Sequence, residues 1–363
     1  MYLDFYILSD WVIIMLEKDY KSLKYEKQLI IFGTLLMTFI CGYFFTTIGL
    51  PNTNNLQVFT AVQKLFNSTI NSGSDVVVNK IILLLRMPRI LLAILAGVGL
   101  AVAGAAMQSV ARNYLVSPFT LGISSAAAFG ASMCIVFGSG TFFQSDVGII
   151  ICAFGASCGC GLVVYGVSRQ IGITPGNIVM VGIALNYLFS AMTATIEFFA
   201  KEHKLEAVVQ WTFGTFNRAT WETVALTGMV VLICFVLLML YCLPLNAMAA
   251  NDDETVKSLG INPEKIRIVC GLLAVFMTAT IISFTGVIGF VGLIAPHMAR
   301  FIIGNDHRYY LPFAGLLGGL LLLFSDAIGK FILSPVNIPV GIIVSFLGVP
   351  LFIHLILSKR QGV

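Results

Sequence analysis

Long apolar segments alternate with short polar ones along most of the chain. Between Gln28 and Ser358, apolar runs of about 18 residues or more recur, separated by charged residues, glycine and proline. A helical run of this length spans the hydrocarbon core of a bilayer, whereas a β-barrel has shorter segments of alternating hydrophobicity. The pattern therefore predicts about ten transmembrane helices, near residues 28–50, 81–110, 119–138, 147–168, 176–200, 223–243, 267–286, 288–303, 311–333 and 338–358.

This pattern predicts an all-α polytopic membrane protein with a single transmembrane domain over residues 28–363. We expect residues 1–27 to form a cytoplasmic or interfacial segment. They are unlike a cleavable signal, because no basic stretch precedes an apolar core. The region 244–266 is the longest connection expected in the cytoplasm, and its helix-compatible, charged part 251–260 offers a soluble partner a binding surface.

The composition agrees with a chain whose solvent is lipid. Charged residues make up 10% of the sequence and apolar residues 58%, whereas a soluble domain contains about 25% charged residues. The net charge of +4 comes from Lys and Arg scattered between the spans, without the basic stripe typical of nucleic-acid binding. The eight cysteines fall within or beside apolar spans and form no CxxC pair, so neither a disulfide framework nor a metal site is predicted.

The basic residues predict that both termini lie in the cytoplasm. In this orientation, 13 of the 21 Lys and Arg residues face the cytoplasm, in agreement with the positive-inside rule. These are Lys18, Lys21, Lys24, Lys27, Arg112, Arg169, Lys257, Lys265, Arg267, Arg300, Arg308, Lys359 and Arg360.

Ionisable residues inside the spans are few. Asp326 and Lys330 stand four positions apart, where a helical ion pair explains both, and Glu197 lies near the end of its span. Chains of buried carboxylates are typical of ion-coupled transport, so their scarcity disfavours the alternative of an ATP-independent secondary transporter of a small solute. No HExxH, GxSxG or P-loop motif occurs, so no catalytic residue is predicted and any ATP hydrolysis must occur on another subunit.

Arg86-Met87-Pro88-Arg89 lies at the expected outer edge of the second span. Pro88 suits the first turn of a helix, where its missing N–H is no loss, and it places both arginines at the water boundary. Two interpretations are open. The arginines either snorkel toward lipid head groups, or they form an electropositive platform for the carboxylates of a soluble partner.

Two further segments interrupt the helical pattern. Residues 108–122, QSVARNYLVSPFTLG, form either a plain helix–helix turn or the moving cytoplasmic mouth of a pore. Residues 285–300, TGVIGFVGLIAPHMAR, predict a discontinuous helix, because irregular backbone at membrane depth needs cover from protein or lines a cavity. A packing role is the first interpretation for the histidine in this segment. The predicted broken region contains Gly286, Gly289, Gly292, Pro296 and His297.

Several segments, in the same order, resemble motifs of one family: the permease subunits of type II ATP-binding-cassette importers for iron–siderophores, haem and cobalamin (FecCD/BtuC-like). The resemblance covers about residues 83–359. The segments that carry it are RMPR at 86–89, GLAVAGAAMQ at 99–108, RNYLVSPFTLGIS at 112–124, WTFGTFNRATW at 211–221, PLNAMAANDDETVKSLGI at 244–261, GFVGLIAPHMAR at 289–300, DHR at 306–308 and IPVGIIVSFLGVPLFIHLIL at 338–357.

The resemblance implies a ten-helix transport subunit of the cytoplasmic (inner) cell membrane, with an inverted repeat of helices 2–5 and 7–10. It implies a homo- or heterodimer that carries a metal chelate by alternating access at the dimer interface. The chelate would be an iron–siderophore, haem or cobalamin. Two cytoplasmic ATPase subunits would hold ATP and magnesium, an extracytoplasmic binding protein would deliver the substrate, and this chain would hold no cofactor and contact lipid but no nucleic acid.

The resemblance also implies roles for individual residues. Three would receive carboxylates from the binding protein: Arg86, Arg89 and Lys330, the last at a position where the family more often has Arg. Five would belong to the ATPase-coupling segment: Asp252, Asp253, Glu254, Leu259 and Gly260. Four would lie near the cytoplasmic gate: Asn113, Leu115, Thr174 and Pro175. The chain departs from the family near this gate at Tyr114, where Pro is common, and at Ser117, where an acidic residue is frequent.

Overall fold

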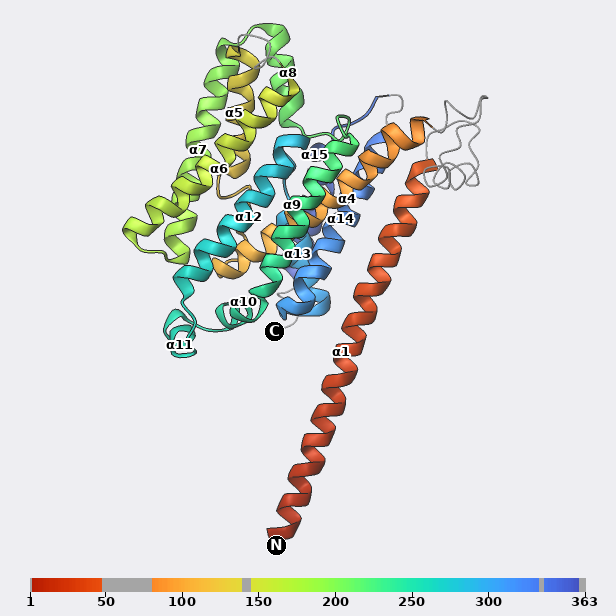
Figure 1. Cartoon of the computed structure of the whole chain (residues 1–363), viewed down its shortest axis with the longest axis vertical. Coiled ribbons are helices and arrows are strands. Elements are labelled where there is room, and N and C mark those ends of the chain that lie inside the picture. Colours follow the sequence, from red (N-terminus) through yellow and green to blue (C-terminus); the bar gives the residue numbers. More distant parts are fainter. Residues whose placement is uncertain (1, 48–79, 139–144, 333–335, 359–363) are drawn as a thin grey trace.

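The computed structural model describes residues 2–47, 80–138, 145–332 and 336–358. Every regular element within these ranges is a helix, and none is a strand (Figure 1). Lys359 and Arg360, which the orientation argument places in the cytoplasm, lie outside the described residues. The all-α class predicted from the apolar runs is confirmed.

Each predicted span corresponds to a helix. Among the described residues, seven helices are long and apolar enough to cross a membrane, and three further apolar helices accompany them. The seven are α1 (Tyr2–Thr47), of which Leu23–Thr46 is the apolar part, η1 (Ile81–Arg86) continued by α4 (Met87–Val110), α6 (Asp146–Ile171), α7 (Pro175–Phe199), α9 (Trp221–Leu240), α12 (Pro263–Thr285) and α14 (His307–Phe331). The other three are α5 (Ile123–Phe137), α13 (Val291–Ile303) and α15 (Val340–Ser358).

Four short helices mark the two ends of the bundle. η1 and α8 (Glu202–Thr212) lie at one end, here called the α8 end (Figure 1). α10 (Cys242–Ala250) and α11 (Asp253–Ser258) lie at the opposite end, here called the α11 end (Figure 1). α4 runs from the α8 end to the α11 end, and α1 also begins toward the α11 end.

α4 is the centre of the bundle and packs against α9, α12, α13 and α14. In its most apolar window 78% of residues are buried, compared with 17% in that of α7. The sequence of α4 explains this position, because it consists largely of Ala, Gly and Val, which allow neighbouring helices to approach closely. A Cβ at Gly97 would lie 2.2 Å from the carbonyl oxygen of Gly318, and one at Gly104 would lie 1.8 Å from that of Gly292. Neither position has room for a side chain.

The predicted interruption falls between α12 and α13 and is shorter than expected. α12 ends at Thr285, residues 286–290 lie outside any helix, and α13 then runs without a break from Val291. Gly286, with φ +74°, ends α12, where a Cβ would lie 2.3 Å from the carbonyl oxygen of Trp211. The sequence interpretation was therefore wrong for Gly292, Pro296 and His297, which lie inside a continuous helix.

A side chain from α4 explains why Pro296 leaves α13 intact. Proline cannot donate the hydrogen bond that the carbonyl of Gly292, four residues earlier, would otherwise accept. Gln108 is fully buried, and its Nε2 lies 3.4 Å from the carbonyl oxygens of both Gly292 and Leu293. Because the Gln108 amide supplies the missing donor, the helix continues through the proline.

The order of long and short helices agrees with an internal repeat. Two sets of four helices share one order of lengths: a long helix, then a short one, then a second long one. The sets are α4, α5, α6 and α7, and α12, α13, α14 and α15. An inverted repeat predicts this arrangement.

Candidate functional site

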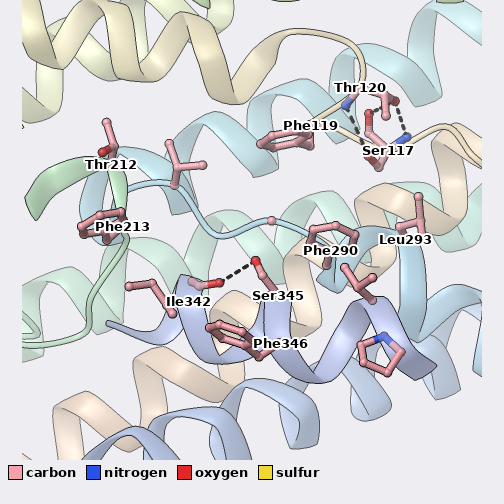
Figure 2. Close-up of a pocket in the computed structure, with 15 residues that line it drawn as sticks. Ser117, Phe119, Thr120, Thr212, Phe213, Phe290, Leu293, Ile342, Ser345 and Phe346 are labelled. Atoms are coloured by element: carbon pink, nitrogen blue, oxygen red, sulfur yellow. Dashed lines mark hydrogen bonds between the residues drawn. The ribbon is translucent and has the colours of Figure 1, made fainter. Parts of the chain in front are cut away.

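A cavity of about 850 Å³ opens beside α15 (Figure 2). The rings of Phe119, Phe213, Phe290 and Phe346 surround it. Its walls come from the loop after α4, the connection between α8 and α9, the α12–α13 break and one face of α15. The residues of the break thus line a cavity, which is one of the two situations that allow irregular backbone at membrane depth.

The wall of this cavity is apolar and uncharged. Its hydroxyl groups are engaged in the wall itself: Ser117 and Thr120 bond to each other's backbone N–H at 2.9 and 3.3 Å, and Ser345 donates to the Gly341 carbonyl at 2.8 Å. No group of three or more His, Cys, Asp or Glu residues that could hold a metal ion occurs among the described residues. The cavity can therefore enclose an apolar or aromatic surface, and its own side chains offer no ligands for a bare cation.

Phe290 occupies an unusual backbone conformation at the edge of the cavity. Its φ of +64° lies in the left-handed region, which a bulky aromatic residue rarely adopts. The residue directly precedes α13 and turns its ring toward the cavity (Figure 2). Strain of this kind is often found where a side chain is held in place for function.

At the α8 end, the residues expected to dock a binding protein lie around one carboxylate. Arg89 Nη2 and Lys330 Nζ lie 2.7 and 2.8 Å from the two oxygens of Asp326. Arg89 also donates to Asn217, and Arg86 donates to the Thr46 carbonyl at 2.8 Å. The Asp326–Lys330 pair expected from the sequence is therefore present, and Arg89 is a partner that the spacing did not indicate.

At the α11 end, the predicted coupling residues lie on two faces. Asp252, Glu254, Leu259 and Gly260 are exposed, and the Leu259 side chain is 60% accessible. Asp252 caps α11 by accepting a hydrogen bond from the Thr255 N–H. Hydrogen bonding from the Thr255 side chain, and then from its N–H, lowers the pKa of the Asp252 carboxyl group.

Asp253, by contrast, points toward the bundle. It accepts hydrogen bonds from Arg267 at 2.7 and 2.8 Å and pairs with Arg112 at 2.8 Å. The hydrogen bonds from Arg267 hold the pKa of Asp253 below its usual value, so this carboxylate is charged.

The predicted gate residues shape two chain segments at the same end. Asn113 Oδ1 accepts a hydrogen bond from the Leu115 N–H at 2.9 Å and stabilises the turn after α4. Thr174 caps α7 by accepting from the Asn177 N–H at 3.2 Å, and Pro175 takes the first helical position. Each segment therefore has a local structural explanation, which neither requires nor excludes a role in gating.

Sequence reasoning assigned no role to a polar cluster at the α11 end. His307 Nε2 lies 2.6 Å from Ser109 Oγ, and its Nδ1 lies 2.6 Å from Asn246 Oδ1. Asn246 in turn donates to Asp306 at 3.0 Å. Burial raises the pKa of Asp306, but hydrogen bonds from Arg308 and Asn246 outweigh it and bring the value to about 2. In the sequence, this cluster is represented by the motif DHR at 306–308 and by Asn246 in PLNAM. Their separation along the chain does not reveal that these side chains are in contact.

With both ends and the cavity described, comparison with known proteins decides the family. The family model described as the FecCD transport family matches residues 34–358. The chain belongs to the FecCD transport family. The expected character of a transmembrane permease subunit of ATP-binding-cassette type is therefore confirmed.

Similar FecCD relatives include proteins from archaea and bacteria. A protein named as an ABC transporter permease from Methanocaldococcus jannaschii is 39% identical over 93% of this chain and 97% of its own length. The hemin transport system permease HmuU of Yersinia pestis is 32% identical over 83% and 90%, and the Fe(3+)-citrate import permease YfmD of Bacillus subtilis is 34% identical over 77% and 82%. A solved structure described as an inward-facing metal-chelate type ABC transporter has a TM-score of 0.79 and 29% identity, covering 91% of this chain and 99% of that one.

The two departures from the FecCD pattern have distinct surroundings. The Tyr114 ring stacks under the guanidinium of Arg300 at 4.0 Å, and the His297 ring lies edge-on to it, with centroids 6.4 Å apart. A proline at position 114 could not make either contact. His297 also lies edge-on to Phe352 at 5.9 Å, which agrees with a packing role. Ser117 closes the turn with Thr120.

Proposed function

We propose that this FecCD permease imports a metal ion enclosed in an organic chelate, such as an iron–siderophore or haem, with cobalamin as a further member of the class. The observation that carries the proposal is the large, aromatic and uncharged cavity. A chelate presents carbon-rich surface outward and brings its own metal ligands, so it suits such a wall. A hydrated cation would lose its water ligands there without replacement.

The names of the relatives support this substrate class. The permeases of Yersinia pestis and Bacillus subtilis are named for hemin and Fe(3+)-citrate, and the solved structure is described as metal-chelate type. These substrates differ in shape and charge. We therefore place the choice of chelate mainly in the binding protein and expect the cavity to discriminate weakly.

The proposal includes separate ATPase subunits on the cytoplasmic side. The chain has no P-loop, so ATP and magnesium would be bound by partners, and this permease would hold no cofactor. The exposed face of α11, with Leu259 at its end, is the proposed contact for an ATPase. The α11 end is then cytoplasmic, as are both termini. Residues 1–27 remain the proposed cytoplasmic or interfacial segment.

The α8 end is then extracytoplasmic and receives the binding protein. Arg89 and Lys330 flank the carboxylate of Asp326, and Arg86 at the start of α4 adds a third cation, which leaves this surface electropositive. An acidic patch on the binding protein would complement it. A second permease subunit, identical or paralogous, would face the cavity and complete the pathway.

The ionic contacts disfavour a secondary transporter. Asp326 lies within a predicted span, and its side chain is 4% exposed and held by two cations. A carboxylate paired in this way is poorly suited to exchange a proton or a sodium ion with solvent. ATP therefore remains the proposed energy source.

Reconstitution tests the proposal. The permease, its ATPase and its binding protein are placed in proteoliposomes, and uptake of ferric siderophore, haem, cobalamin and uncomplexed iron is measured with and without ATP. We expect ATP-dependent uptake of at least one chelate, no uptake of uncomplexed iron, and no loss on adding a protonophore. Uptake of a bare ion, or uptake that a protonophore abolishes without ATP, would contradict the proposal.

A further inference from the structure

Asp253 differs from the other coupling residues because it faces the permease and not a partner. It lies in the first turn of α11, between the exposed residues Asp252 and Glu254. Both of its oxygens accept hydrogen bonds from Arg267, at 2.7 and 2.8 Å. Val256, one turn later, is fully buried in the main core of the protein. α11 is therefore anchored to the bundle through one carboxylate and one apolar side chain.

Arg267 connects α11 to the segments that were predicted to form the gate. Its side chain is completely buried at the start of α12. Besides Asp253, it donates to the carbonyl of Val110 at 3.2 Å and to that of Ile173 at 3.1 Å. Val110 is the last residue of α4, directly before the turn that contains Asn113, and Ile173 directly precedes Thr174. One guanidinium group thus contacts both gate segments and the coupling helix.

Arg112 makes a second connection to the same carboxylate. It pairs with Asp253 at 2.8 Å and donates from Nε to the Met248 carbonyl of α10 at 2.7 Å. Its φ of +45° places it in the left-handed region, which is unfavourable for arginine. The contacts with Asp253 and Met248 hold Arg112 in this conformation, so the turn after α4 is tied to both α11 and α10.

The chemistry makes this joint rigid. A fully buried guanidinium must keep its charge and cannot exchange one partner for water, so it holds its acceptors at fixed positions. The planar, forked guanidinium of Arg267 donates four hydrogen bonds to three separate chain segments, one more than the three N–H groups of a lysine could supply.

We infer that the Asp253–Arg267 ion pair, with Arg112 beside it, transmits movement of α11 to the gate segments at Val110 and Ile173. The inference rests on the proposed function, in which an ATPase moves α11. Asp253, Arg267 and Arg112 are positioning residues, and the exposed residues of α11 supply only the contact with the ATPase.

The test compares two neighbouring carboxylates. Asp253→Asn removes the charge that pairs with Arg267. Asp252→Asn removes a charge one residue earlier but preserves the helix cap, because Asn caps as well as Asp. Each variant is reconstituted in the full complex, and both ATP hydrolysis and chelate uptake are measured. We expect Asp253→Asn to bind the ATPase and hydrolyse ATP normally while the chelate transported per ATP falls roughly tenfold or more. Asp252→Asn lies on the side that contacts the ATPase, so any loss there should lower ATP hydrolysis and chelate uptake together and leave the chelate transported per ATP unchanged.

A second measurement does not depend on the substrate. Hydrogen exchange of residues 111–122 and 172–175 is compared in the nucleotide-free complex and in the complex trapped with nucleotide and vanadate. In the wild type we expect trapping to change exchange in both segments, and in Asp253→Asn we expect this response to disappear. If the wild type responds but no chelate is taken up, the proposed substrate is wrong and the inference stands.

Two variants separate transmission from simple stabilisation. Asp253→Asn combined with Arg267→Gln removes the buried guanidinium together with its carboxylate, and Arg112, which also loses this partner, is 26% exposed. Thermal stability should therefore largely recover while transport per ATP stays low. Arg267→Lys keeps the charge but loses the forked contacts, and should also uncouple transport from hydrolysis. The inference is overturned if Asp253→Asn or Arg267→Lys transports as much chelate per ATP as the wild type. It is also overturned if the double variant recovers the wild-type amount of chelate per ATP.

Discussion

Arg89 and Asp326 form an ion pair that joins α4 to α14 at the α8 end. Arg89 Nη2 lies 2.7 Å from Asp326 Oδ1, and its Nε lies 3.0 and 3.1 Å from the two carboxylate oxygens. The side chains are 12% and 4% exposed, so both are largely removed from water. Arg89 is therefore a structural residue as well as a proposed docking residue, and the two roles must be separated experimentally.

Arg86 gives the cleaner test of docking. Reversing Arg89 would place a carboxylate against Asp326 and destabilise the fold, whereas Arg86 donates to the backbone carbonyl of Thr46. We expect Arg86→Glu to weaken binding of the binding protein at least tenfold at low salt, as measured by surface plasmon resonance. Lys80→Glu, an exposed position at the same end, is the control. Unchanged affinity in Arg86→Glu would argue against the docking role.

Asp326 is predicted to be essential for stability. Asp326→Asn leaves Arg89 without its buried anionic partner, and such a loss costs about 3 kcal/mol. Lys330→Met removes the more exposed cation and should cost less than about 1 kcal/mol, because the Arg89 pair remains. Thermal unfolding in detergent compares the two variants. Equal effects would show that the Arg89–Asp326 pair contributes no more than the Lys330 pair.

The Arg89–Asp326 pair also shows where prediction from the sequence ends. The transmembrane spans follow from apolar runs, and the Asp326–Lys330 pair follows from helical spacing, because residues four apart share a face. Arg89 and Asp326 are 237 positions apart, and no local pattern relates them. Arg267 was counted only as a basic residue at the cytoplasmic boundary. Its complete burial depends on how α4, α11 and α12 pack, which the sequence of one chain does not reveal.

Gln108 and Pro296 allow a double-mutant cycle on α13. Gln108→Met removes the donor that lies near the Gly292 and Leu293 carbonyls, and leaving buried carbonyls unpaired costs about 1–3 kcal/mol. Pro296→Ala restores a backbone N–H four residues after Gly292. We expect the double variant to be more stable than Gln108→Met alone, as measured by thermal unfolding. Strict additivity of the two changes would contradict the compensation described here.

Asp306 predicts how stability depends on pH at the α11 end. Its pKa is lowered from the ordinary value of 3.8 to about 2, so the folded state prefers the charged form. The charged Asp306 carboxylate contributes to the free energy of unfolding in full above the ordinary pKa. This contribution is lost as the pH falls through the range from 3.8 to about 2. Asp306→Asn should lower thermal stability near neutral pH and reduce the loss seen on acidification across this range. A parallel shift of the whole pH profile would assign the acid sensitivity to other carboxylates.

Leu259 tests the exposed face of α11 independently of Asp253. The side chain is 60% accessible and follows the last turn of α11, so the fold does not depend on its burial. If it inserts into an ATPase, Leu259→Asp places a charge in an apolar contact and should release the ATPase during purification without lowering thermal stability. Leu259→Met keeps the apolar contact and should retain the ATPase. In contrast, Asp253→Asn is expected to retain the ATPase but transport poorly. Loss of the ATPase from both Leu259→Asp and Asp253→Asn would mean that α11 acts as a single contact surface, with no separate inward-facing joint.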